Sequence, residues 1–314
     1  MTQVFSVQAQ PTDAASWLRL AQRCEQAGFD TLQAADHPGS CAAPSVALAA
    51  AAAVTTRIRL GAYVSNAGVR EPIHLAADVA TLDVISGGRA RLGLGAGHTP
   101  AEWRAIGRER PDVRGRVDRC LAVAEAVVAL LAGETVTRRE PGETVTRREP
   151  LLEMAEARLD KPRPVQDRIP LTIGTANSRI LRWAGQHADI VGLSGLGRTL
   201  EDGHRHEARW RPDQVDRQIE QVVTGAATRA EPPALEALVQ IVAVTDDAEA
   251  AAAPHAENLG MPVPELLEAP FVLIGTGDEI RAAMARNEKR WGITRYAVRA
   301  DAVDAIVDAG LVRA

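Results

Sequence analysis

The chain has 314 residues, 46% of them hydrophobic, so it can bury a large core, and its length fits two domains or one α/β barrel. Acidic and basic residues are mixed throughout and give a formal net charge of -5; with no basic stripe, neither nucleic acid nor an anionic membrane is expected as a partner. Three cysteines without a CxxC pair are typical of a reducing compartment, and the N-terminus lacks a signal-peptide pattern, which together predict a cytoplasmic protein.

Strand patterns and helix patterns alternate along the first half of the chain. The first strand, 4–10, precedes a helix that Thr12-Asp13 caps and that ends at Gly28. Further strands are expected at 31–36, 57–64 and 90–96, and further helices at 44–56, at 72–85, from about Pro100, and at 113–132.

The same alternation resumes at residue 170. Strands are expected at 170–175, 188–194, 237–244 and 294–300, and helices at 178–186, 212–225, from Gly275–Ile280 to about Trp291, and at 301–309. The eight strands are continuously apolar and each precedes a helix, which predicts a (β/α)8 TIM barrel in a single domain, 1–314. A doubly wound sheet is the alternative, but its GxGxxG fingerprint is missing: Gly93, Gly95 and Gly97 give only GxGxG.

A nine-residue unit occurs twice without change in GETVTRREPGETVTRREP, 133–150. A surface loop tolerates such an insertion, because the entropy of loop closure grows only with the logarithm of loop length. The segment is therefore expected outside the core, within an excursion that spans 133–168. Either the two TVTRRE runs pair as an exposed hairpin around a turn at EPGE, or the loop is disordered.

Polar residues follow several of the predicted strands, where the active site of such a barrel lies. Asp36 and His37 follow the second strand, and His37 is the best catalytic candidate, since Asp36 could fix its tautomer for proton transfer. Alternatively, Asp36 caps a turn and His37 fills space. The other strand-end candidates are Ser65, Asn66, Gly97, Thr99, Glu102, Thr175, Ala176, Asn177, Ser178 and Ser194.

Thr175–Ser178 leads into a helix, whose N-terminus can bind a phosphate. On spacing alone, an ordinary helix cap by Asn177 or Ser178 is the favoured reading. His204 and His206 have i,i+2 spacing, which points them to different faces of a helix, so no metal site is expected.

Two stretches carry a family resemblance: GFDTLQAADH, 28–37, and RIRLGAYVSNAGVREPIHLAADVATLDVISGGRARLGLGAG, 57–97. They resemble the bacterial luciferase-like monooxygenases, and most closely the branch that depends on coenzyme F420. The resemblance implies a barrel, usually a homodimer, that binds F420 or FMN at its C-terminal mouth. It also places the 133–168 excursion beside the mouth, as a lid that excludes water.

The resemblance also implies roles for individual residues. Asp36 and His37 would lie beside the ring system, with His37 as proton donor or as the group that orients the substrate. Tyr63-Val64 would form a non-prolyl cis peptide against the ring. The other implied cofactor contacts are Ser65, Asn66, Gly97, Thr99 and Glu102 around the ring, and Gly174, Thr175, Ala176, Asn177 and Ser178 in the phosphate loop.

This chain departs from the family pattern at three places. The loop after the fifth strand, GTANS, is poor in glycine, so the side chains of Asn177 and Ser178 would share the phosphate contacts. The segment 38–41 lacks the tryptophan of the sugar-phosphate dehydrogenases, which argues against that substrate. His98-Thr99-Pro100 replaces the usual aromatic residue.

The resemblance implies an F420-dependent oxidoreductase that transfers hydride between the deazaflavin and a small organic substrate. One alternative is an FMN-dependent monooxygenase of the same fold, which would need a flavin reductase as partner. Another is a non-catalytic flavin-binding barrel, because fold does not fix function.

Overall fold

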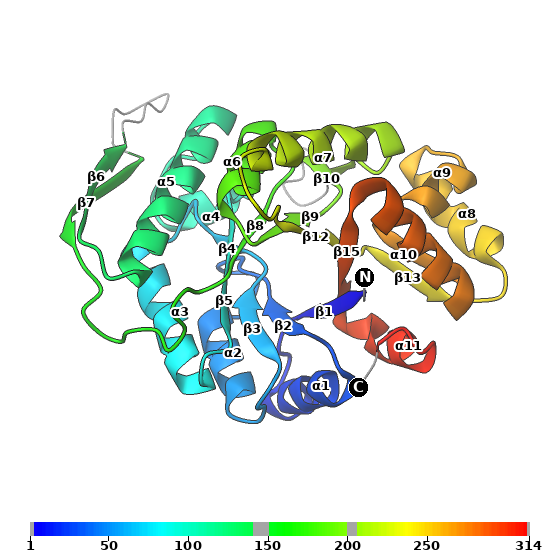
Figure 1. Ribbon diagram of the computed structural model, residues 1–314, viewed down its shortest axis with the longest axis horizontal. Coiled ribbons are helices and arrows are strands. Elements are labelled where there is room, and N and C mark those ends of the chain that lie inside the picture. Colours follow the sequence, from blue (N-terminus) through cyan, green and yellow to red (C-terminus); the bar gives the residue numbers. More distant parts are fainter. Residues whose placement is uncertain (1–2, 141–150, 200–205, 313–314) are drawn as a thin grey trace.

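A computed structural model describes residues 3–140, 151–199 and 206–312. Within these ranges, eight parallel strands close into a barrel in the order β3-β2-β1-β15-β12-β9-β8-β5, and pairing of β3 with β5 completes the ring (Figure 1). The predicted (β/α)8 barrel is confirmed. Its strands are β1 (Val4–Ala9), β2 (Thr31–Ala34), β3 (Arg59–Ala62), β5 (Ala90–Gly95), β8 (Leu171–Gly174), β9 (Ile190–Leu193), β12 (Ala234–Leu238) and β15 (Ile293–Arg299).

Helices surround the barrel, and local sequence signals fix their ends (Figure 1). Asp13 caps the first helix by accepting from the N–H of Ser16, and Gly28 ends it in the left-handed conformation that glycine adopts without strain. No helix in the described part of the chain is both long and apolar enough to cross a membrane. The helices around the barrel include α1 (Ala14–Ala27), α2 (Pro44–Ala52), α3 (Pro72–Ser86), α4 (Pro100–Ala105), α5 (Val113–Leu131), α6 (Ser178–His187), α7 (Pro212–Ala226), α10 (Gly277–Trp291) and α11 (Val303–Asp308), the last preceded by η1 (Ala300–Ala302).

The predicted strand 237–244 is wrong in its extent, because the apolar run contains two strands. β12 ends at Leu238, and β13 (Ile241–Val244) pairs in parallel with β14 (Val272–Gly275) outside the barrel. Between them lie α8 (Ala248–Leu259) and α9 (Val263–Glu268), which the sequence analysis missed. A run of apolar residues that only Gln240 interrupts does not show where one strand ends and the next begins.

The excursion forms an antiparallel ribbon of β6 (Val136–Glu140) and β7 (Leu152–Ala157) beside α5 (Figure 1). The first TVTRRE run therefore pairs with LEMAEA, whose Leu152 is 1% exposed and anchors β7 in the core. Pairing of the two runs with each other stays a prediction. The second copy, 144–149, lies outside the described residues, and a lid role for 133–168 stays a prediction.

Candidate active site

The chain leaves β3 through a bulge whose Tyr63–Val64 peptide bond is cis, which confirms the expectation for this non-prolyl pair. Val64 packs where two strands end in glycine: a Cβ on Gly95 would lie 2.4 Å from Val64 Cγ2, and one on Gly174 would lie 2.9 Å from Val64 Cγ1. A Cβ on Gly192 of β9 would likewise lie 2.3 Å from the hydroxyl oxygen of Tyr63. The bulge thus reaches across the carboxyl end of the barrel, where only glycine leaves room for it.

His37 follows β2 and is the centre of the candidate site. Its Nδ1 lies 2.7 Å from Oε1 of Glu102, a residue of α4 that is 3% exposed. The second oxygen of Glu102 accepts a 2.5 Å hydrogen bond from Asn66 Nδ2. The hydrogen bond to Glu102 raises the pKa of His37; burial opposes it, and the charges of Glu102 and Asp36 add to the rise. An ionised Glu102 accepts the proton on Nδ1, so Nε2 is left for a ligand.

Asp36 has a different role from the one that the sequence predicts. Arg70 holds its carboxylate with two bonds, 2.5 Å from Nε to Oδ2 and 2.7 Å from Nη2 to Oδ1. The backbone N–H of Asn66 donates to Oδ2 at 2.9 Å. The expectation that Asp36 fixes the tautomer of His37 is therefore wrong, because Glu102 is the partner of the ring. Successive side chains of an extended segment point to opposite sides, so the side chains of Asp36 and His37 point away from each other.

The other residues expected around the ring lie beside this group. Ser65 and Asn66 form the two-residue strand β4 (Ser65–Asn66), which pairs with the end of β5. Gly97 has a φ of +68°, and a Cβ there would lie 2.0 Å from Asn66 Oδ1, so only glycine fits. Thr99 is 8% exposed, and its carbonyl accepts from the N–H of Glu102. Glu102 contacts His37 and Asn66 with its two oxygens, so it acts here as the partner of the histidine.

Two further histidines lie next to His37. Ring centroids are 5.2 Å apart for His37 and His98, and 4.6 Å apart for His98 and His206. Burial, and then the positive charge of neighbouring residues, lowers the pKa of His98 to about 4, so its ring is neutral at neutral pH. His206 belongs to β11 (His206–Ala208), which pairs with β10 (Leu196–Thr199), and not to the helix that the spacing argument assumed. His204 lies outside the described residues, among which no group of three His, Cys, Asp or Glu is placed to hold a metal.

Arg110 and Arg116 add positive charge close to His98, and the sequence analysis missed both. Burial lowers the pKa of Arg110, and burial together with the charge of Arg110 lowers the pKa of Arg116 to about 10, against the opposing charge of Asp112. Arg116 donates to the carbonyl of Gly97 at 3.0 Å, while the Nε atoms of both arginines are buried without a partner. Neither guanidinium forms an ion pair with any described residue. Like charges in a partly buried site repel, so a bound anion would stabilise this cluster.

The loop after β8 is organised as a helix cap. Oδ1 of Asn177 accepts from the N–H groups of Arg179 and Ile180, at 3.0 and 3.2 Å, and Thr175 Oγ1 accepts from the N–H of Asn177 at 3.0 Å. The cap reading is thus confirmed for Asn177, whose Oδ1 is already engaged. A phosphate at this loop would use the remaining groups of Thr175, Ala176 and Ser178, and that role stays a prediction.

The family model described as luciferase-like monooxygenase matches residues 1–310. The chain belongs to this family. Its curated relatives carry two kinds of name. The 4-hydroxyprotoasukamycin monooxygenase of Streptomyces nodosus subsp. asukaensis is 34% identical over 176 residues, 54% of this chain and 44% of that protein. The F420-dependent glucose-6-phosphate dehydrogenase of Beutenbergia cavernae is 33% identical over 200 residues, 60% of this chain and 55% of that protein.

The chain spans about half the length of these curated relatives in the matched regions. The solved structure of the coenzyme F420-dependent tetrahydromethanopterin reductase from Methanopyrus kandleri superimposes with a TM-score of 0.73 at 18% identity, over 98% of both chains, which shows the shared fold. Curated relatives are thus named both as monooxygenases and as a reductase or dehydrogenase, and the names include dependence on F420 and, for a solved structure, a complex with FMN.

Proposed function

We propose that the protein is an F420-dependent oxidoreductase that transfers hydride between the deazaflavin and a small organic substrate. The observation that carries the proposal is the His37 ring, bound to buried Glu102 at 2.7 Å, with its Nε2 left for a ligand. When bound, the deazaflavin would supply or accept the hydride. FMN is the alternative cofactor, and its relatives' monooxygenase names support it.

The residues present fit a cofactor with an anionic tail. Both F420 and FMN carry a phosphate, and F420 also carries carboxylates. The guanidinium groups of Arg110 and Arg116, which form no ion pair within the described part of the chain, would bind such an anion with charge-assisted hydrogen bonds. The ring would lie against the bulge at Val64, whose side chain occupies the space that the glycines at the strand ends leave free.

His37 would move the proton that accompanies the hydride. In the direction of oxidation, Nε2 takes the hydroxyl proton as the hydride leaves the adjacent carbon; in reduction, Nε2 returns it to the carbonyl oxygen. Glu102 holds the ring by Nδ1 in both directions. Its charge also stabilises the imidazolium form, in agreement with the raised pKa of His37.

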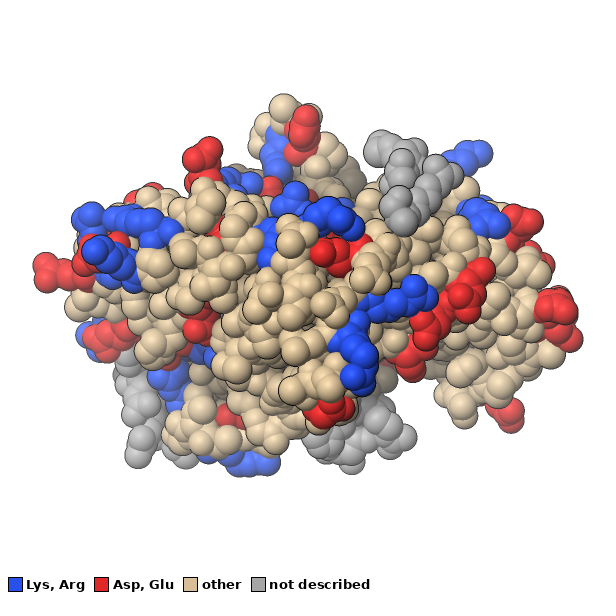
Figure 2. Space-filling view, turned by 90° about the horizontal axis from the view of Figure 1, so that it is seen from below, with Lys and Arg blue, Asp and Glu red and all other residues tan. Residues whose placement is uncertain are grey.

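We also propose a homodimer that buries the outer face of α2 and α3. α2 contains no charged residue, and its Val46 is 70% exposed; on α3, Val84 and Ile85 are 44% and 51% exposed. Figure 2, seen from the side of α1 and α2, shows a broad area without charged side chains in the middle of that face. Light scattering tests this: the wild type should have the mass of a dimer and Val46→Glu the mass of a monomer.

Titration with F420 and with FMN, read by fluorescence quenching, tests the cofactor. Binding of F420 alone supports the proposal, binding of FMN alone supports the monooxygenase, and binding of neither leaves the non-catalytic barrel. His37→Ala should then lower kcat by about a hundredfold or more with little change in cofactor affinity. His255→Ala, at an exposed position of α8, is the matched control and should leave both unchanged. Equal losses of turnover and affinity in His37→Ala would remove its proton role.

A further inference from the structure

Arg119 of α5 is among the largest fully buried side chains, at 1% exposed. Its guanidinium is occupied almost entirely by backbone carbonyls. Burial lowers its pKa, and the charge of Glu71 opposes that effect. The acceptors are the carbonyls of Ala67 at 3.0 Å, Gly68 at 2.8 Å and Arg70 at 3.0 Å, Glu71 Oε1 at 3.1 Å, and the carbonyl of Leu151.

Three of these carbonyls belong to one short segment, 67–70, which connects two groups of the candidate site. At its start, Asn66 donates to Glu102, the partner of His37. At its end, Arg70 holds the carboxylate of Asp36 with two bonds. Arg119 therefore fixes the backbone between Asn66 and Arg70. These two residues bind the buried carboxylates of the site, Glu102 and Asp36 respectively.

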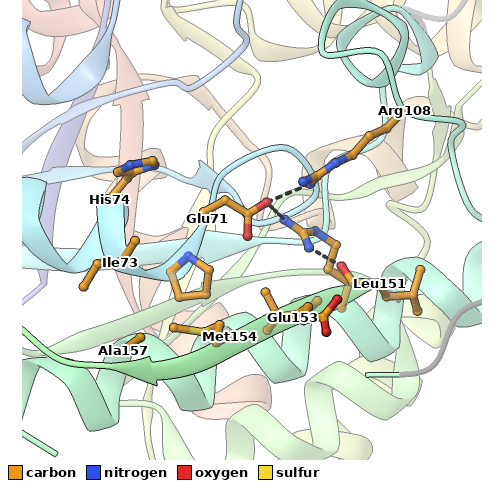
Figure 3. Close-up of a pocket in the computed structure, with 11 residues that line it drawn as sticks. Glu71, Ile73, His74, Arg108, Leu151, Glu153, Met154 and Ala157 are labelled. Carbon is orange, nitrogen blue, oxygen red and sulfur yellow. Dashed lines mark hydrogen bonds and ion pairs between the residues drawn. The ribbon is translucent and has the colours of Figure 1, made fainter. Parts of the chain in front are cut away.

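The two remaining acceptors connect Arg119 to the excursion, through Leu151, and to the start of α3, through Glu71. Leu151 precedes β7, and Glu71 also binds Arg108 at 2.8 Å. Glu71, Arg108, Arg119 and Leu151 line one end of a cavity of about 580 Å³ that lies between the start of α3 and β7 (Figure 3). A single guanidinium thus links the ribbon to the segment that carries the site, and no other described side chain bonds to both Leu151 and the 67–70 carbonyls.

We propose that Arg119 is a positioning residue of the active site, which acts through Arg70 and Asp36 on the protonation of His37. The inference rests on the proposed function only in taking His37 as the catalytic group. If the 67–70 segment loses its anchor, Arg70 moves away from Asp36 and the carboxylate charge is no longer neutralised. Asp36 raises the pKa of His37 by its charge, so the pKa of His37 should then rise further.

Arg119→Lys tests this, because lysine keeps the charge but cannot satisfy the same set of acceptors. Arg89→Lys is the matched control: Arg89 is also buried, and it donates only to residues near the amino end of the barrel, such as Ser86 at 2.7 Å and Ile58 at 2.9 Å. Three quantities are measured in both variants: stability to urea, the NMR titration of His37, and kcat with KM. The His37 resonance is assigned by its loss in His37→Gln.

Both variants should be destabilised, whereas only Arg119→Lys should raise the pKa of His37 and lower kcat at least tenfold with KM changed less than threefold. An unchanged His37 titration in folded Arg119→Lys would overturn the proposal and leave Arg119 a fold-stabilising residue. The titration needs no turnover, so it still decides the role of Arg119 if neither cofactor supports activity. If Arg119→Lys fails to fold, Arg70→Met gives the second test, because methionine removes the cation that neutralises Asp36: the same upward change is expected, and its absence would overturn the pathway through Asp36.

Discussion

Replacing Glu102 with glutamine probes the group on which the proposed chemistry depends most. Both carboxylate oxygens are engaged, one by His37 Nδ1 at 2.7 Å and the other by Asn66 Nδ2 at 2.5 Å. A glutamine offers one oxygen and one NH2 group in their place. Asn66 cannot turn to accept from the NH2, because its own Oδ1 already accepts from the N–H of Gly68 at 2.9 Å.

The glutamine oxygen must therefore face Asn66, and its NH2 must face His37. Nδ1 of the ring then has to accept a hydrogen bond, so the neutral ring carries its proton on Nε2 and presents no lone pair to the substrate. General acid–base catalysis by a positioned side chain contributes about a hundredfold to ten-thousandfold, so we expect kcat to fall by at least about a hundredfold. Cofactor affinity should change little.

The same replacement should change the pH dependence. The carboxylate raises the pKa of His37, so removing it lowers that pKa, and the neutral form persists to lower pH. A charge-assisted hydrogen bond contributes about 1 kcal/mol more stabilisation than a neutral one, which corresponds to roughly a fivefold change in the protonation equilibrium. We expect the change in the protonation equilibrium to be smaller than this, because 35% of the His37 side chain is exposed and solvent screens the pair.

The assay is kcat across the titration range of histidine, combined with nitrogen NMR of the ring to identify the protonated nitrogen. Glu257→Gln, at an exposed position of α8, is the control. If Glu102→Gln kept wild-type kcat and a proton on Nδ1, the pairing argument would be refuted.

Three further predictions concern charge and packing in the site. Arg116→Ala should weaken cofactor binding about tenfold or more at low ionic strength and less at high salt, measured by quenching titrations, since screening reduces the attraction between the anion and the remaining cations. Gly95→Ala should lower stability by about 1–3 kcal/mol and reduce cofactor affinity, because its Cβ would lie 2.4 Å from Val64 Cγ2; urea unfolding that matches wild type would contradict this. Arg70→Met should cost about 3–5 kcal/mol in urea unfolding, since it leaves buried Asp36 without its ion pair, and a much smaller loss would mean that water replaces the guanidinium.

The sequence predicts the barrel well, because eight continuously apolar runs each followed by a helical pattern admit few other folds. Strand ends then locate His37, Asn66 and Thr99 near one another without knowledge of any contact. The pairing within the site is not predictable in this way. Glu102 reaches His37 across 65 residues of sequence, and Asp36, adjacent in the chain, binds Arg70 instead. Nearness in sequence favoured the wrong carboxylate, because side-chain direction at a strand end depends on the register of the strand.

The positive and negative charges of the site divide into two systems with different consequences. Asp36 with Arg70, and Glu102 with His37, are matched pairs whose carboxylates are at most 3% exposed, so their geometry is set before any ligand binds. Arg110 and Arg116 form no ion pair among the described residues; burial lowers the pKa of both, and the charge of Arg110 adds to the lowering for Arg116. Matched groups suit the reacting end of a site, which must be fixed, whereas unmatched cations gain most from an incoming anion. A ligand that carries its reactive part and its negative charge at opposite ends would satisfy both systems at once, and the flavin and deazaflavin cofactors have this form.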